Sequence, residues 1–185
     1  MNTDDTILMQ LSRIEAKLDN FCKRKEQKSE DENKVKIGSN EYTLKKLPDG
    51  KVWMMENLRE EVEGAVWNDR YRCYMYTFDE AQKAVPEGFH LPSAREFFKL
   101  ALALGYLEKD ETVAMNRFIK ECGFALTGHV SYTGVMVNQG HYGFYWSSTQ
   151  SGETFGYCLY FDSTGVNPVN DYCKTLGMAV RLIKD

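Results

Sequence analysis

Two helix-start motifs lie close together in the middle of the chain. Thr77 and Ser93 are each followed three residues later by Glu. In such a capping box the hydroxyl and the carboxylate satisfy backbone N–H groups that the first turn of a helix leaves unpaired. Pro86 ends the first predicted helix, and Gly105 ends the second. The motifs therefore predict two short helices that begin directly after Thr77 and Ser93.

The segments around these helices predict strands and a third helix. In "EYTLKKLPDGKVWMMENLR", residues 48–50 form a turn between two short strands, because Pro presets φ and Gly accepts a positive φ. "ETVAMNRFIKEC" has a helical pattern that Gly123 closes, and the rest of the chain has patterns of strand and loop. A hairpin, short helices and a long β-rich end predict a mixed α+β domain.

The stretch "ETFGYCLYFDSTG" alternates like a strand. Tyr157, Leu159 and Phe161 fall on one face and predict its apolar side. The other face carries Gly156, Cys158, Tyr160 and Asp162. A strand with one buried face should expose polar residues on the other, and Cys158 and Tyr160 break that rule. Either a second helix covers this face, or it is a recognition surface in which Tyr supplies contact area at a low cost in entropy.

Residues 178–185, "MAVRLIKD", also alternate, with Val180 and Leu182 against Arg181. We expect these residues to form the partner strand of the stretch above. Residues 166–176, which lie between the two, have no regular period, and we expect a loop there.

The N-terminal segment predicts a coiled coil. Its apolar residues follow steps of four and three: Ile7, Leu11, Ile14, Leu18 and Phe21. This repeat puts Leu11 and Leu18 at the a positions and the others at the d positions of a heptad, and Leu at a with Ile at d favours trimers or tetramers. The alternative is a single amphipathic helix packed on its own domain, which usually shows a wider apolar stripe.

These patterns divide the chain into three parts. We expect an oligomerising helix at residues 1–27, a charged linker or helix extension at residues 28–36, and the α+β domain at residues 37–185. No apolar run is long enough to cross a membrane, so we expect no membrane insertion. The acidic N-terminus lacks a basic and apolar leader. We therefore expect synthesis in the cytoplasm without a signal peptide. A role outside the cell would need another route of export, such as assembly into a virion.

Charge, cysteines and histidines exclude several kinds of site. The chain of 185 residues has a formal net charge of −4, which argues against a nucleic-acid partner. The five cysteines are widely spaced and odd in number, which favours free thiols over a disulfide framework. The three histidines form no close ligand pair with them, as zinc would require. Asn167, Asn170 and Asp171 are only a faint echo of a calcium-binding sequence, so we expect no metal and no cofactor. His90, near a helix start, is expected to be structural rather than a general base.

Four segments in a fixed order resemble one family. "LPDGKVWMMENLR", "AQKAVPEGFHLPSAREFFKL", "GFYWSST" and "GMAVRLIKD" are similar to segments of the Fibrobacter succinogenes major paralogous domain. They also resemble the variable proteins of diversity-generating retroelements from Bacteroides and its phages. The resemblance covers residues 37–185 and implies a C-type-lectin-like fold that binds a ligand and is not an enzyme. The N-terminal coiled coil would make such a module multivalent.

The resemblance also implies a set of binding residues. In the retroelement family, asparagine codons in a C-terminal repeat are rewritten, and the fold displays the resulting side chains on its lectin-like face. The implied ligand-binding residues are Phe144, Thr154, Phe155, Cys158, Tyr160, Asp162, Asn170, Asp171, Tyr172, Cys173, Thr175 and Leu176. Tyr157, Leu159 and Phe161 would be scaffold, and Lys174 and Met178 are not reachable from an asparagine codon. The implied partner is a protein or glycan on a bacterial surface. If a phage encodes the chain, the implied location of the chain is the phage tail.

Two other classes of protein remain open. Formylglycine-generating enzymes share this fold and hold copper between two closely spaced cysteines, whereas Cys158 and Cys173 are far apart in the sequence. A structural assembly protein, with the coiled coil as its main function, would leave the aromatic residues at the chain end unexplained.

The heptad pattern predicts that the full chain is a trimer or a tetramer. Replacing Leu11 and Leu18 together by Asp should give a folded monomer, because the α+β domain has its own core. Sedimentation equilibrium measures both masses. A monomeric wild-type chain would contradict the coiled coil.

Overall fold

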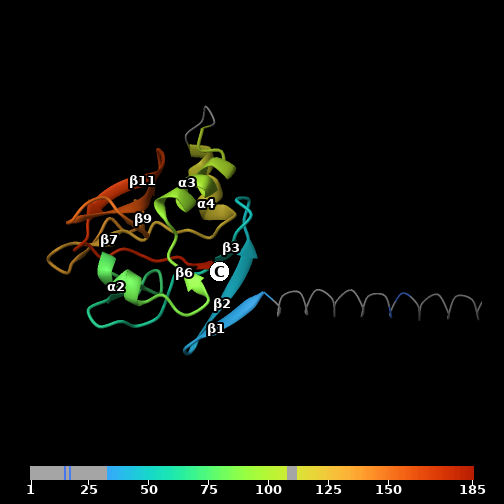
Figure 1. Ribbon diagram of the computed structural model, residues 1–185. Helices are drawn as coiled ribbons and strands as arrows, with labels where there is room; N and C mark the ends of the chain where they lie inside the picture. Colours follow the sequence, from blue (N-terminus) through green and yellow to red (C-terminus); the bar gives the residue numbers. More distant parts are fainter. Residues whose placement is uncertain (1–14, 16, 18–32, 108–111) are drawn as a thin grey trace, which may run out of the picture. The chain divides into compact units, whose positions relative to one another are not determined.

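The computed structural model describes residues 15, 17, 33–107 and 112–185 (Figure 1). The chain divides into two units, residues 1–34 and residues 35–185. The apolar repeat predicted at residues 7–21 lies outside the described residues. Of that segment only Glu15 and Lys17 are described, and both are helical and exposed. The coiled coil and its trimer or tetramer therefore stay predictions.

The larger sheet brings the first and last strands of the domain together. Its strands lie in the order β1-β2-β3-β12-β6. Their bounds are β1 Lys34–Ile37, β2 Asn40–Lys46, β3 Val52–Met54, β6 Phe89–His90 and β12 Ile183–Lys184. The predicted turn between β2 and β3 is confirmed: the Leu47 N–H donates to the Lys51 carbonyl at 2.9 Å, and Gly50 has a φ of 85°. Strand β12 pairs with β3 on one side and β6 on the other, where Figure 1 places the C-terminus.

Short helices begin where the capping boxes predicted them. The described helices of the domain are α2 Phe78–Lys83, α3 Ala94–Ala103 and α4 Thr112–Lys120. Both boxes are confirmed: the Thr77 hydroxyl accepts a hydrogen bond from the backbone N–H of Glu80, and the Ser93 hydroxyl accepts one from Glu96. The domain holds more strand than helix, so the mixed α+β class is confirmed.

The second sheet has the order β11-β10-β9. Its strands are β9 Gly143–Gln150, β10 Phe155–Asp162 and β11 Gly165–Cys173. The predicted partner of β10 was wrong: residues 166–173, expected to be part of a loop, lie in β11 and pair with β10, whereas Ala179 bridges to Tyr145 of β9 and residues 183–184 form β12 in the larger sheet. The regular alternation of β11 is lost because its pairing with β10 is irregular between Cys158 and Tyr160, and such an irregularity changes which side chains share a face.

Two small hairpins lie outside these sheets. Strand β4 (Val66–Asn68) pairs with β5 (Cys73–Met75), and β7 (His129–Val130) pairs with β8 (Met136–Val137). The turn between β7 and β8 leaves the Tyr132 side chain 84% exposed.

Strand β10 is covered on both faces around Gly156 and Cys158, where the sequence left open whether another element packs over the second face. Leu159 and Phe161 lie in a core cluster with residues of α3 and α4, the helices that Figure 1 shows beside the second sheet. On the other face the Phe78 ring lies over Gly156, where a Cβ atom would come within 2.4 Å of it. Cys158, on the same face, is fully buried. The covering residue comes from the start of α2, far away in the sequence, and no local pattern could reveal it.

A buried arginine connects the end of the chain to two distant loops. Arg181 is only 1% exposed. Its guanidinium donates to the Asn57 side-chain oxygen at 2.7 and 3.2 Å, and at 2.8–3.2 Å to the backbone carbonyls of Met54, Cys122 and Gly123. These bonds use all of the N–H groups that an arginine side chain has. The residue therefore lies in the core, and not on the polar side of a strand that pairs with β10.

We predict that Arg181→Met lowers the free energy of unfolding by about 3–5 kcal/mol. The methionine fills a similar space, but it leaves three carbonyls and an amide oxygen buried without donors. The exposed Arg95→Met is the matched control and should change stability by less than about 0.5 kcal/mol. Urea unfolding measures both. Equal stability of the two variants would show that the buried network contributes nothing.

Candidate functional site

A cavity of about 350 Å³ lies beside the second sheet. Among the described residues, its lining consists of His129, Asn138, Tyr142, Phe144, Tyr160 and Tyr172. All three strands of the second sheet contribute, together with β7 and the segment before β9. A concave site with aromatic walls and a few polar groups is the usual form of a ligand-binding pocket.

Strand register brings the rings of this cavity together. Tyr160 of β10 lies opposite Phe144 of β9, so their side chains share one face of the sheet. Tyr172 of β11 lies on the same face, opposite Gly156. The ring centroid of Phe144 is 5.2 Å from that of Tyr160 and 5.3 Å from that of Tyr172. Tyr142 stacks on Tyr160 with centroids 5.7 Å apart.

The rings differ in depth. Phe144 is 3% exposed and belongs to a core cluster, whereas Tyr142, Tyr160 and Tyr172 are half-buried and pack against that cluster. Phe144 is therefore the floor of the cavity, and the three tyrosines are its walls. Rings held by a packed core need little further ordering when a ligand binds.

A carboxylate supports one of these walls. The Tyr160 hydroxyl donates a hydrogen bond to Asp162 Oδ2, and burial together with this bond raises the pKa of Tyr160. Asp162 Oδ1 accepts from the backbone N–H and the hydroxyl of Thr164 at 2.7 and 2.6 Å. Partial burial acts against ionisation of Asp162, but these hydrogen bonds lower its pKa. A charged carboxylate thus lies behind a neutral phenol.

His129 lines the cavity without adding charge. Burial lowers its pKa, so the imidazole is neutral at pH 7. Its ring stands at 77° to the Phe144 ring, with centroids 4.9 Å apart. The Nδ1 atom is buried and has no hydrogen-bond partner within the described residues.

The structure brings part of the predicted binding set together. Phe144, Tyr160 and Tyr172 line the cavity, and Asp162 is hydrogen-bonded to one of them. Leu176 is half-buried and packs against the same core cluster. Asn170 is half-buried on the same sheet face, opposite Cys158.

Other members of the predicted set lie elsewhere. Phe155, Asp171 and Cys173 lie on the opposite face of the sheet, because Phe155 pairs with Cys173 and Asp171 pairs with Tyr157. Thr154 and Thr175 are exposed beyond the strand ends. Tyr157, expected to be a core residue, is only half-buried.

Cys158 is not a surface residue, which contradicts its place in the predicted set. Its side chain is fully buried, and burial raises the pKa of the thiol. It lies opposite Trp146 of β9, and the Phe78 ring packs edge-on against Trp146 with centroids 5.4 Å apart. Of the two explanations for the residues on this face, packing applies to Gly156 and Cys158. The cover over Gly156 is Phe78, the first residue of α2, and Cys158 belongs to the same core cluster as Phe78 and Ala81 of that helix.

Three residues of the cavity were missed from the sequence. Tyr142 has a weak signal, because it precedes Phe144 by two residues and so continues the alternation of β9. His129 and Asn138 have none, since they belong to a hairpin that only the fold brings to the sheet. Asn138 does have a φ of 62°, a conformation that asparagine tolerates better than most residues.

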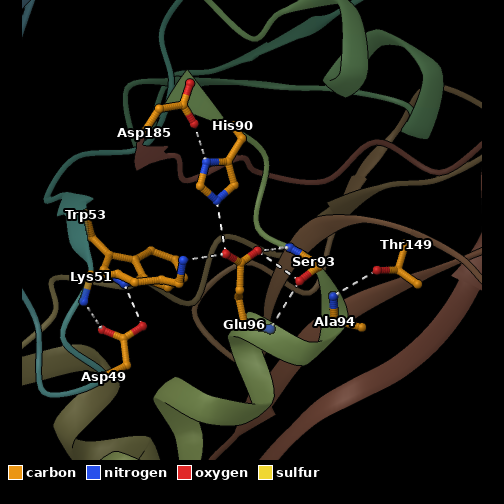
Figure 2. A network of polar contacts seen from close by, with 9 residues as sticks. All are labelled: Asp49, Lys51, Trp53, His90, Ser93, Ala94, Glu96, Thr149 and Asp185. Atoms are coloured by element: carbon orange, nitrogen blue, oxygen red, sulfur yellow. Dashed lines mark hydrogen bonds and ion pairs between the residues drawn. The ribbon is translucent and has the colours of Figure 1, made fainter. Parts of the chain in front are cut away.

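His90 lies in a separate polar network (Figure 2). Its Nδ1 is 2.7 Å from Asp185 Oδ1, and its Nε2 is 3.0 Å from Glu96 Oε1. Lys51 Nζ is 2.9 Å from the same Glu96 oxygen. Burial opposes ionisation of Glu96, but hydrogen bonds from Lys51, Ser93 and His90 lower its pKa to about 2. The network joins the start of α3 to the chain end, which fits a structural role for His90.

The described cysteines are free thiols: Cys73, Cys122, Cys158 and Cys173. Burial raises the pKa values of Cys73 and Cys122 to about 11, so both stay protonated at neutral pH. Cys158 and Cys173 lie on opposite faces of the sheet and form no thiol pair. Among the described residues, no three His, Cys, Asp or Glu side chains gather closely enough to hold a metal ion.

No helix among the described residues is both long and apolar enough to span a membrane.

Comparison with known proteins gives one similarity. Residues 103–183 match the model of a family described as a domain of unknown function, DUF8237. The match includes β9, β10 and β11 and all of the described residues that line the cavity. No curated protein and no solved structure matches the chain.

The burial of Cys158 generates a direct test. If Cys158 were a displayed position of the kind that the family resemblance implies, its unmutated codon would encode asparagine and Cys158→Asn should be neutral. We expect instead a loss of about 2–4 kcal/mol, because a larger side chain brings a polar amide into a packed site. The exposed Thr154→Asn is the control and should stay within about 0.5 kcal/mol of the wild type. Urea unfolding of both variants distinguishes the outcomes. An unchanged free energy of unfolding for Cys158→Asn would show that Cys158 can belong to the predicted binding set after all.

Proposed function

We propose that the chain is a ligand-binding module, a variable protein of the diversity-generating retroelement type with a C-type-lectin-like fold over residues 37–185. The observation that carries the proposal is the aromatic cavity whose walls are Tyr142, Tyr160 and Tyr172. Such side chains supply rigid contact area at a low cost in entropy. The ligand is a protein or glycan on a bacterial surface.

The placement of the resembling segments supports this proposal. "LPDGKVWMMENLR" contains β3, "GFYWSST" lies in β9, and "GMAVRLIKD" contains β12. Arg181 of the last segment donates to Met54 and Asn57 of the first. Ala179 forms a β-bridge with Tyr145 of β9. Segments that are far apart in the sequence thus meet in one core, as residues that define a shared fold should.

The proposal assigns different roles to buried and exposed members of the predicted set. Phe144 and Cys158 belong to the scaffold, since a buried position cannot be diversified freely. Tyr160 and Tyr172 contact the ligand. The exposed Thr154, like the other exposed members, offers a position that can vary without loss of stability.

The N-terminal helix contributes multivalency in this proposal. A trimer or tetramer presents several cavities on one body, and moderate sites that bind a repetitive surface together hold it far more tightly than one site. An enzyme of the formylglycine-generating type is not favoured, because Cys158 and Cys173 lie on opposite sheet faces.

Adsorption of the labelled full chain to a panel of Bacteroides strains and to a glycan array tests the proposal. Tyr160→Leu and Tyr172→Leu should each weaken adsorption at least about tenfold, as loss of an aromatic anchor usually does. The control is Tyr157→Leu, a half-buried tyrosine on the opposite face of the same sheet. It should adsorb like the wild type.

Two outcomes would contradict the proposal. One is a wild-type chain that adsorbs to no strain and no glycan. The other is equal adsorption by the wild type and both cavity variants, which would place the binding surface elsewhere.

A further inference from the structure

The cavity is a box of rings rather than a flat platform. The rings of His129, Tyr142, Tyr160 and Tyr172 surround the Phe144 ring at centroid distances of 4.9, 6.2, 5.2 and 5.3 Å. Their planes are inclined to the floor ring by 77°, 50°, 53° and 89°. A small group that enters the box therefore meets aromatic rings on several sides at once.

The charges around this box favour a cation. Among the described residues, its lining includes no Lys or Arg, and His129 is neutral at pH 7. The face of an aromatic ring is the negative end of its quadrupole. Because the Tyr160 hydroxyl donates to the Asp162 carboxylate, electron density shifts toward the Tyr160 ring and strengthens its attraction for a positive group.

The hydrogen bonds of Asp162 suit a quaternary cation, which needs no acceptor. Asp162 Oδ1 already accepts two bonds from Thr164, and Oδ2 accepts the Tyr160 hydroxyl. A lysine ammonium brings three N–H donors that need acceptors, whereas a trimethylammonium group brings none. Methyl groups that share the positive charge also pack well against aromatic rings.

We propose that the aromatic cavity binds a trimethylammonium group, as carried by a choline headgroup or a trimethylated lysine. This inference rests on the proposed function and names the chemistry recognised at the same site. Recognition comes from the box formed by Tyr142, Phe144, Tyr160 and Tyr172, with Asp162 as the nearby negative charge.

The test compares two probes of the same shape and different charge. The full chain is titrated with choline and with 3,3-dimethylbutan-1-ol, in which a carbon atom replaces the charged nitrogen, and the chemical shifts of the tyrosine ring protons are followed. Choline should bind at least about tenfold more tightly and should perturb the rings of Tyr142, Tyr160 and Tyr172. Phosphocholine and Nε-trimethyl-lysine, titrated in parallel with unmethylated lysine, distinguish the two sources of the cation.

Variants assign the effect to the box. Tyr142→Leu and Tyr160→Leu should reduce the preference for choline over the neutral probe to about twofold or less, because leucine fills space without a π face. Asp162→Asn should reduce the preference by a smaller factor, since the ring remains. The control Tyr157→Leu, on the opposite sheet face, should keep the wild-type preference.

The outcomes separate this inference from the proposed function. Equal affinity for choline and its neutral analogue would overturn the cation site and leave an apolar pocket. Shifts caused by methyl glycosides, with choline silent, would identify a sugar site and again overturn it. In both cases adsorption to cells or glycans that depends on Tyr160 and Tyr172 would still support the module. If the cavity variants adsorb and bind the probes as well as the wild type does, both the cation site and the proposed function are overturned.

Discussion

The fold depends on a buried guanidinium. Arg181 is satisfied by the Asn57 side chain and three backbone carbonyls, and its charge lies 4.6 Å from the ring centroid of Phe124. A buried charge is tolerated only where each N–H finds an acceptor, so the loops after β3 and α4 must aim their carbonyls at one point. The loop after α4 can do so because Gly123 has a φ of 69° and a Cβ there would come within 2.9 Å of the Met55 carbonyl oxygen. Segments from the start, middle and end of the domain are thereby mutually dependent.

Residues 178–183, which include Arg181, lie between the two clusters of the core. Met178, Val180 and Leu182 belong to one buried cluster, and Ala179 and Ile183 belong to the other. Residues 178–183 pair instead with Tyr76, with Tyr145 of β9 and with Trp53 of β3, and β11 pairs with β10. The second sheet is then packed on both sides near Cys158. Toward Tyr160 the cover gives way to half-buried rings, and this is where the cavity lies.

Local features of this fold could be predicted from the sequence, and non-local ones could not. The capping boxes at Thr77 and Ser93 and the turn before Lys51 depend on neighbouring residues, and each is confirmed. The alternation of residues 178–185 was real, but alternation cannot show that both faces are buried. For the site, the broken alternation of β10 pointed to Tyr160, whereas Tyr172 of β11 was named through the family resemblance. His129 was missed, and Cys158 was misplaced, because their surroundings come from β7 and α2.

Phe144 links the core to the cavity. Its ring belongs to the core cluster and is also the floor against which Tyr160 and Tyr172 stand. A floor fixed by packing supports the walls, and the hydrogen bond from the Tyr160 hydroxyl to Asp162 adds to that support. Changes at the walls alter the shape and charge of the cavity at a modest cost in stability, because those rings are only half-buried. A scaffold built in this way can present different surfaces on one core, which is the property that a diversified binding module needs.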